Sequence, residues 1–278
     1  MTALLRAYAL ASRIAGPVIA RSEMGKLARA GLGAARQAEK TGHASLPRPD
    51  GALIWLHGAS VGESLSLLPL VDRIRRISPE IGCLVTSGTA SSAALLDDRL
   101  PEGVIHQFMA LDCRAYARRF LDHWRPELAV FAESEIWPVH LRELARRRIP
   151  TALINARMSE KSRNAWARRP ATAAEIFGRF ALLTAQSDDM ARALARLGAA
   201  SDTIRTGPEL KSLAPPPPVD QSALAQMGDW AGRDPLWLAA STHPGEDEIV
   251  LDAQSRLREA LPDARLIIVP RHPERGAD

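Results

Sequence analysis

Short apolar runs alternate with helical patterns along most of this chain, and that alternation restricts its fold more than any other feature. Seven such runs come before a stretch of prolines. Strands that alternate with helices form parallel sheets with helices packed on both faces. We therefore predict an α/β fold with a doubly wound sheet. The predicted strands are 53–56, 83–86, 104–108, 128–132, 151–154, 182–184 and 204–206.

The first predicted strand leads into a glycine-containing turn and then a helical pattern. This turn includes Gly58, Ser60, Gly62 and Glu63. In open α/β sheets such a turn lies at the carboxyl end of its strand, where ligands bind. Glycines let the backbone approach a ligand, and a helix N-terminus offers N–H groups to an anion. Glu63 is then either a first-turn acid that suits the helix dipole or a general base at the mouth of a cleft.

Polar residues follow the other predicted strands as well. They are Ser87 and Thr89, Glu133 and Glu135, Asn155 and Arg157, Gln186 and Ser187, and Lys211. Because the carboxyl ends of parallel strands share one edge of the sheet, we expect these residues to line a single crevice. Two interpretations of Glu133 and Glu135 stay open. They form a helix N-cap with a solvated second acid, or one of them holds or polarises a substrate.

Residues 215–218 are four consecutive prolines, which predict a stiff, extended linker at a domain boundary. Beyond them, predicted strands at 236–240 and 266–269 flank a helix at 248–261. Two strands and one helix are too few for a domain, so we expect the second lobe to be truncated in this chain. Lys211 comes just before the linker and is either a solvated lysine or a cation for an anionic substrate.

Both strands of the second lobe also end in polar loops. Ser241 and Thr242 follow the first strand, and their hydroxyl and N–H groups suit a phosphate. Arg271, His272 and Arg275 follow the second strand. Arginine binds phosphate or carboxylate through forked hydrogen bonds, so this loop suits an anionic ligand. The alternative interpretation is a basic surface loop.

The net charge of +4 and the pI near 9.5 favour anionic partners without identifying one. Aromatic residues make up only 5% of the chain, and they do not interleave with basic residues as a base-stacking surface requires. We therefore expect no nucleic-acid partner. Cys83 and Cys113 belong to no CxxC pair, and the histidines do not cluster at ligand spacing. We predict no metal site and no cofactor.

The first 40 residues are basic and partly apolar. Arg6 and Arg13 interrupt the apolar run and Pro17 ends it, so we expect no stretch that spans a bilayer. The segment either lies on an anionic membrane surface or forms a surface helix that caps the domain. Its seven basic residues are Arg6, Arg13, Arg21, Lys26, Arg29, Arg36 and Lys40, against the acids Glu23 and Glu39.

Five ordered motifs resemble those of the bacterial 3-deoxy-D-manno-octulosonic acid (Kdo) transferases, glycosyltransferase family 30. The first is the run Trp55-Leu-His-Gly-Ala-Ser-Val-Gly-Glu63, which resembles the family signature. The others are Glu133-Ser-Glu-Ile-Trp-Pro138, Asn155-Ala-Arg-Met-Ser159, Ala240-Ser-Thr-His-Pro-Gly-Glu246 and Pro270-Arg-His-Pro-Glu-Arg275. Five motifs in the same order are far more specific than any one of them.

The resemblance implies a GT-B architecture, in which two Rossmann-like lobes hold the active site between them. It implies an inverting transfer of Kdo from CMP-Kdo to a lipid A precursor, lipid IVA, in lipopolysaccharide synthesis, without a required metal. The location implied is the cytoplasmic face of the inner membrane, with peripheral or N-terminal anchoring. The expected division is a membrane-associating segment 1–40, an acceptor-binding lobe 41–212, a linker 213–219 and a CMP-Kdo-binding lobe that begins at 220–278.

Particular residues match family positions with assigned roles. By this resemblance Glu63 accepts the proton of the attacking sugar hydroxyl, and Glu133 and Lys211 stabilise the transition state. Carboxylates favour a cation-like sugar centre, and a lysine offsets charge on the departing phosphate. The substrate-binding positions implied are Arg271, His272, Ser241, Thr242, Glu135, Asn155 and Arg157.

Two segments depart from the family pattern. The family reads Gly-Asn-Leu-Lys where this chain has Gly207-Pro-Glu-Leu-Lys211, and Pro-Leu-Asp or Pro-Tyr-Asp where it has Ala110-Leu-Asp112. These departures leave a second hypothesis, a GT-B enzyme that uses another sugar nucleotide or acceptor. The truncated second lobe and the basic N-terminus leave a third, an inactive binding fragment at a membrane surface.

Overall fold

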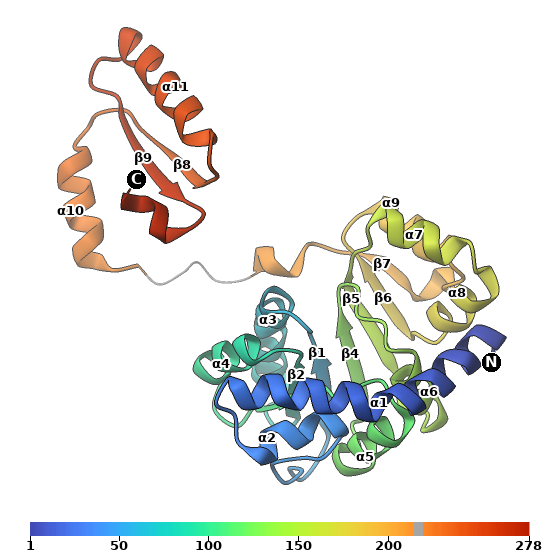
Figure 1. The fold of residues 1–278 in the computed structure, drawn as a ribbon. Helices are drawn as coiled ribbons and strands as arrows, with labels where there is room; N and C mark the ends of the chain where they lie inside the picture. The colour runs from blue at the N-terminus through green and yellow to red at the C-terminus, as the bar shows by residue number, and fades with distance from the viewer. Residues whose placement is uncertain (214–218, 278) are drawn as a thin grey trace. The chain divides into compact units, whose positions relative to one another are not determined.

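The computed structural model describes residues 1–213 and 219–277, and the chain divides into two compact units, Met1–Pro215 and Pro216–Asp278. Each unit has its own parallel sheet (Figure 1). The side chains of residues 211, 213, 273 and 277 lie outside the description.

The first unit is built on a seven-stranded sheet in which every neighbouring pair is parallel. Its order is β3-β2-β1-β4-β5-β6-β7, so the strand order reverses between β1 and β4. This topology confirms the predicted doubly wound α/β fold, and ligands of such sheets bind where the order reverses. The strands are β1 (Leu53–His57), β2 (Gly82–Ser87), β3 (Ile105–Phe108), β4 (Leu128–Ala132), β5 (Thr151–Ala156), β6 (Leu182–Ala185) and β7 (Ile204–Thr206).

Both faces of this sheet are covered, which explains why its central strands read as apolar runs. Alternate residues of β1 face opposite sides. Trp55 belongs to one core cluster, with Phe120 and Phe131, and Leu56 belongs to another, with Val71. The connecting helices are α3 (Val61–Ile77), α4 (Ala90–Arg99), α5 (Arg114–Trp124), α6 (Pro138–Arg146), α7 (Glu160–Ala167), α8 (Pro170–Phe177) and α9 (Asp188–Arg196).

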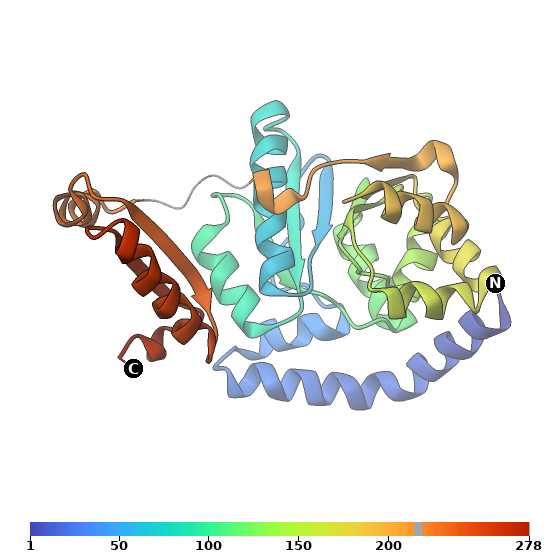
Figure 2. The ribbon, with the colours of Figure 1, turned by 90° about the horizontal axis from the view of Figure 1, so that it is seen from above.

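A long N-terminal helix, α1 (Ala3–Arg29), runs along one side of the first unit (Figure 2). It continues through Pro17 and contacts the unit through one face, whose buried residues include Leu5, Gly16 and Leu27. A Cβ atom at Gly16 would lie 3.3 Å from the Cys113 side chain, so glycine lets the helix approach closely. The chain then forms α2 (Ala34–Ala38) and η1 (Glu39–Thr41).

The expectation that no N-terminal stretch could span a bilayer is wrong. Helix α1 is long and apolar enough to do so by length and composition, a test that signal sequences and core helices also pass. Arg6 and Arg13 are too few to disqualify a helix of 27 residues. Most of its large apolar side chains are exposed, namely Leu4, Tyr8, Leu10, Ile14, Val18 and Ile19.

The second unit begins with α10 (Gln221–Ala231) and contains β8 (Leu236–Thr242), α11 (Glu246–Ala260), β9 (Arg265–Pro270) and η4 (Pro273–Ala277). The two strands pair in parallel, from Leu236 opposite Arg265 to Thr242 opposite Pro270. Both strands and α11 were predicted from the sequence, each within about two residues of the observed bounds. The carboxyl ends of β8 and β9 therefore lie side by side.

Candidate active site

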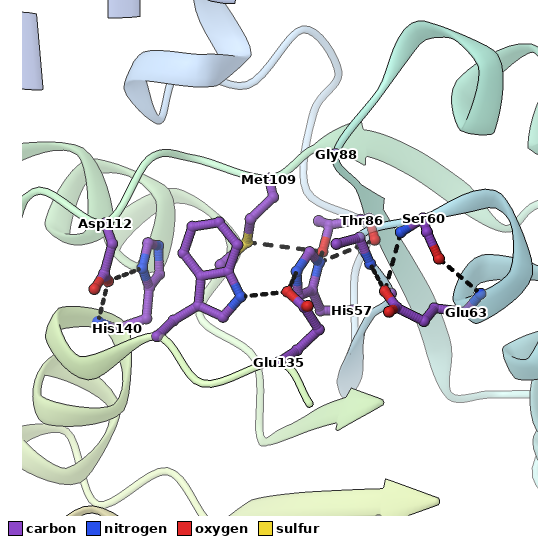
Figure 3. A network of polar contacts seen from close by, with 12 residues as sticks. His57, Ser60, Glu63, Thr86, Gly88, Met109, Asp112, Glu135 and His140 are labelled. Carbon is purple, nitrogen blue, oxygen red and sulfur yellow. Dashed lines mark hydrogen bonds and ion pairs between the residues drawn. The ribbon is translucent and has the colours of Figure 1, made fainter. Parts of the chain in front are cut away.

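The candidate site lies at the carboxyl edge of the first sheet, where the strand order reverses. Strand β1 ends at His57 and its neighbour β4 ends at Ala132. The loops that follow carry Glu63 on one side and Glu133 and Glu135 on the other. Figure 3 shows the polar contacts that connect these loops. The structure thus brings together carboxylates that are about 70 residues apart in the sequence.

Glu63 closes a capping box at the start of α3. Its Oε2 accepts hydrogen bonds from the backbone N–H groups of Ala59 (2.7 Å) and Ser60 (3.0 Å). The Ser60 Oγ accepts in turn from the Glu63 N–H at 3.2 Å. Glu63 therefore caps α3, as one of the two interpretations predicted. The capping hydrogen bonds hold its half-buried carboxylate in a fixed orientation. The role of Glu63 as a proton acceptor stays a prediction.

Two glycines allow this turn to pack against its neighbours. A Cβ atom at Gly58 would lie 2.8 Å from the Glu63 carbonyl carbon, and one at Gly88 would lie 2.8 Å from the Ala59 oxygen. The Gly88 N–H donates to that oxygen at 2.9 Å, which ties the end of β2 to the turn after β1. Both positions require glycine because a side chain would collide with backbone.

Glu135 is held by two donors on different elements. Its Oε2 accepts from His57 Nε2 at 3.2 Å and from the Trp137 indole N–H at 2.8 Å. His57 is fully buried, and its Nδ1 lies 2.9 Å from Thr86 Oγ1. Burial raises the pKa of Glu135, but the hydrogen bonds from His57 and Trp137 outweigh it and hold that pKa below its usual value. Glu135 is therefore an anion that joins the loop after β4 to the ends of β1 and β2.

Glu133, directly after β4, and Asn155, the residue before the last of β5, both lie in the left-handed region, with φ of 56° and 55°. The Glu133 N–H donates to Ile154 (2.9 Å) and its carbonyl accepts from the Arg157 N–H (3.3 Å), so the two loops are joined through backbone. Non-glycine residues with positive φ are uncommon and often lie at functional sites. Both side chains are nearly buried, at 8% and 2% exposed.

The remaining predicted residues of the first unit lie at the same edge. Asn155 Oδ1 accepts from the Leu210 N–H at 3.2 Å, and Leu210 begins η3 (Leu210–Leu213). This contact places the backbone next to Lys211 at the edge, although the Lys211 side chain lies outside the described residues. Arg157 is exposed. The edge therefore gathers Glu63, Glu133, Glu135, Asn155, Arg157 and the η3 backbone.

The sequence reasoning assigned no role to His57, Thr86 or Trp137. The signal available was a histidine at the end of an apolar strand, directly before the glycine turn. Its partners come from β2 and from the loop after β4, so only the strand order reveals the contact. Within residues 1–213 and 219–277, no three His, Cys, Asp or Glu side chains gather as a metal site would require.

Asp112 lies two residues after Ala110, where the chain departs from the family pattern, and it caps α6. Its carboxylate accepts from the backbone N–H groups of Val139 (3.1 Å) and His140 (3.0 Å), and it lies 2.8 Å from His140 Nδ1. Capping by Asp112 fixes where α6 begins, directly after Trp137. The departure at Ala110 thus leaves the acidic group and its helix contact in place.

In the second unit, the predicted anion-binding residues come from two adjacent strand ends. Ser241 has φ of 63°, and the Thr242 carbonyl accepts from the Arg271 N–H at 3.0 Å. Arg271 and His272 are exposed, whereas Arg275 is engaged with Thr242 O (3.0 Å) and in an ion pair with Asp247. Arg275 therefore holds the two loops together, whereas the Arg271 side chain is exposed.

Residues 30–214 match the family model described as 3-deoxy-D-manno-octulosonic-acid transferase (kdotransferase). The chain is 39% identical over 224 residues to the 3-deoxy-D-manno-octulosonic acid transferase of Rickettsia felis, with 81% of this chain and 48% of that protein covered. It is 31% identical to the Haemophilus influenzae protein of the same name, with 84% and 55% covered. The chain therefore spans about half the length of the curated relatives it matches.

Solved structures share the fold. UDP-GlcNAc 2-epimerase from Neisseria meningitidis superposes with a TM-score of 0.54 at 12% identity, covering 78% of this chain and 65% of that one. A glycosyltransferase from Rickettsia africae gives 0.52 at 11% identity, covering 82% and 64%. At such low identity the likeness concerns the fold alone.

Proposed function

The chain belongs to the 3-deoxy-D-manno-octulosonic-acid transferase family, and from this premise we propose that it forms the acceptor-binding half, and the beginning of the donor-binding half, of an inverting Kdo transferase. The proposed donor is CMP-Kdo and the proposed acceptor is a lipid A precursor, lipid IVA. The observation that carries the proposal is that Glu63, Glu133 and Glu135 follow the carboxyl ends of β1 and β4, the two neighbouring strands between which the strand order reverses.

We assign to Glu63 the removal of the proton from the attacking acceptor hydroxyl. Oε1 takes no hydrogen bond from any residue in the described part of the chain, whereas Oε2 is held by Ala59 and Ser60. A base of this kind is oriented before the substrate arrives, which lowers the entropy that must be lost in the reaction. The hydroxyl oxygen bonds to the anomeric carbon as the bond to the CMP phosphate breaks, and the proton passes to Glu63.

Glu133, Lys211 and Glu135 would act on the charges that develop in this step. The sugar centre becomes cation-like, and a carboxylate such as Glu133 stabilises it. Lys211 offsets the negative charge on the departing phosphate. Glu135 and Arg157 are assigned to binding the sugar hydroxyls and carboxylate, whereas the side-chain oxygen of Asn155, also expected at this site, is engaged with the Leu210 N–H. Support comes from the low pKa of the Glu135 carboxyl group and from the exposed Arg157 side chain.

The donor nucleotide is assigned to the second unit. Arg271 and His272 would bind the CMP phosphate, and Ser241 and Thr242 would donate hydroxyl or N–H hydrogen bonds to it. Support comes from the pairing of β8 with β9, which brings the two loops together, and from the exposed Arg271 guanidinium. The boundaries proposed for the two lobes are 41–212 and 220–278, joined by residues 213–219.

Helix α1 is proposed to hold the protein at the cytoplasmic face of the inner membrane. Support comes from its exposed apolar residues, among them Ile14 and Val18, and from the basic residues that accompany them, such as Arg13 and Arg21. Apolar side chains enter the interface while cations attract anionic lipid. A lipid acceptor would then be reached from the membrane surface.

The experiment is a transfer assay on the complete gene product with CMP-Kdo and lipid IVA, in which released CMP and glycosylated lipid are both measured. We expect Glu63→Gln to lower kcat by roughly 10²- to 10⁴-fold, the usual contribution of a general base. Glutamine can still cap Ala59 and Ser60, so this variant separates proton transfer from capping.

The matched control is Glu80→Gln, because Glu80 is an exposed acid near the amino end of β2, opposite to the carboxyl edge, and its loss should leave kcat unchanged. Full activity of Glu63→Gln would refute the assignment of the base. Turnover with UDP-sugars in place of CMP-Kdo would instead reject the proposed donor and favour a different sugar nucleotide.

A further inference from the structure

Asn155 makes contacts that a residue serving only to bind substrate would not need. Its backbone N–H donates to Thr184 Oγ1 at 2.9 Å and its carbonyl accepts from Gln186 Nε2 at 3.4 Å, which anchor it to the end of β6. Its side chain is 2% exposed and reaches across the edge to Leu210. The acceptor oxygen is therefore already engaged with the protein.

The contact to Leu210 fixes where η3 begins. Asn155 Oδ1 accepts from the Leu210 N–H at 3.2 Å, and the Leu210 side chain packs against the core cluster that contains Leu56 and Val71. Gly207, three residues earlier, continues the β6–β7 ladder by donating to Ala185 O at 3.0 Å. Residues 208 and 209 therefore connect Gly207, which is bonded to β6, with Leu210, which is bonded to Asn155. The N–H that Asn155 accepts belongs to the residue directly before Lys211.

We infer that Asn155 is a positioning residue, whose side-chain oxygen holds the η3 backbone that carries Lys211. The inference rests on the proposed function, because it concerns the efficiency of the step assigned to Lys211. It also explains why an asparagine occupies a left-handed position. Asparagine tolerates φ of 55° and supplies the acceptor, whereas glycine would supply only the conformation.

Two substitutions separate the acceptor from the backbone conformation. Asn155→Gly keeps the left-handed φ and removes Oδ1, so the protein should fold while η3 loses its anchor. Asn155→Asp keeps an acceptor for the Leu210 N–H and replaces the amide nitrogen. The matched control is Arg148→Gly, since Arg148 is exposed, has φ of 56° and follows α6 at the start of the loop to β5.

The first measurement needs no turnover. Hydrogen–deuterium exchange of the segment 208–213 should accelerate about tenfold or more in Asn155→Gly, because its anchoring hydrogen bond is lost. It should stay near the wild-type rate in Asn155→Asp and in Arg148→Gly. Unchanged exchange in Asn155→Gly would overturn the inference, whether or not the protein transfers Kdo.

The second measurement is a double-mutant cycle in the transfer assay of the complete gene product. Asn155→Gly should lower kcat about tenfold, because a small displacement of a catalytic group is costly. In a Lys211→Ala background, Asn155→Gly should have no further effect, because Asn155 acts through Lys211. Additive losses would show that Asn155 touches the substrate instead, and would overturn the inference. Absence of Kdo transfer by the wild type would reject the proposed function alone.

Discussion

The carboxyl edge of the first sheet has two stretches that differ in how far they bury their ionisable groups. Over β2 and β3, the segment formed by α2 and η1 places Glu39 in full burial. Glu39 accepts from Arg36 Nη1 (3.0 Å), from the Phe108 N–H (2.7 Å) and from the Ser45 hydroxyl, so both of its oxygens are used. Over β1, β4 and β5, the Glu135 side chain keeps 16% of its surface and Arg157 is exposed.

The two stretches also differ in the partners of their ionisable groups. In the Glu39 region, the Arg36 guanidinium must donate to His106 Nδ1 (2.6 Å), so His106 is neutral with its proton on Nε2, directed at Ser87 Oγ (2.9 Å). Lys40 is also buried there, and its Nζ donates to Gly88 O at 2.7 Å. These groups satisfy one another. The groups of the Glu39 region therefore use their polar atoms within the protein, whereas Glu135 and Arg157 keep surface that is accessible to a ligand.

The largest effect expected from this comparison is the loss of Glu39. Glu39→Ala leaves the Phe108 N–H without its acceptor and removes the carboxylate that pairs with Arg36, so it should lower the free energy of unfolding by about 3–5 kcal/mol. Glu133→Gln, at a site with a similarly buried carboxylate, should lower it much less and reduce transfer instead. Urea denaturation together with the transfer assay measures both. Equal stability losses in the two variants would erase the distinction between the two stretches.

The second effect concerns Lys40, whose pKa burial lowers to about 8. The unfolded chain, with a lysine pKa near 10.4, binds the proton at higher pH than the folded protein does. The free energy of unfolding should therefore rise by about 3 kcal/mol as the pH increases from 8 to 10.5.

Lys40→Met should abolish this rise, because the titrating group is gone. Denaturation at several pH values in both proteins provides the test. The exposed Lys161 gives a matched control, Lys161→Met, which should keep the wild-type dependence. A rise that persists in Lys40→Met would mean that other groups cause it.

The third effect concerns His57, which contacts Glu135 in the candidate active site. His57→Leu removes one of the two donors that keep the pKa of Glu135 low and leaves only Trp137 to oppose burial, so that pKa should rise. If Glu135 must be ionised to bind substrate, the acidic limb of the kcat/KM profile should move to higher pH. A rate loss of about tenfold at neutral pH should accompany it. A profile lowered uniformly at every pH would point to misfolding rather than to the carboxylate, and thermal melting checks this.

The central strands could be predicted because they are buried on both faces. Residues 128–132 were predicted with the bounds that β4 has in the structure, and all of them but Leu128 are buried. Such strands need apolar side chains on every residue, and this pattern is local in the sequence. The polar residues after the strands could be placed at one edge for the same reason, since parallel strands end together.

The contacts within the edge could not be predicted, because they depend on strand order. His57 meets Glu135 only because β1 lies beside β4, and Asn155 meets Leu210 only because η3 returns over β5. The N-terminal charges show the same limit. Arg36, Glu39 and Lys40 were counted in a segment expected either to lie on a membrane surface or to cap the domain from its surface, yet Glu39 and Lys40 are buried against β2 and β3. Composition gives the charge of a segment but not its partner.

The smallest expected effect concerns the Ser60 hydroxyl, where a loss of helix capping can be distinguished from a loss of catalysis. Ser60 caps α3 by accepting from the Glu63 N–H, and Ser159 caps α7 by accepting from the Ser162 N–H, both at 3.2 Å. Replacing either serine by alanine should lower the free energy of unfolding by about 1 kcal/mol, the usual cost of a lost N-cap. Only Ser60→Ala should also reduce transfer, because its turn holds the proposed base. If Ser159→Ala reduced transfer equally, the effect of Ser60→Ala could not be assigned to the proposed base. The stretch of the edge around Glu63 would then differ from the Glu39 region only in its packing.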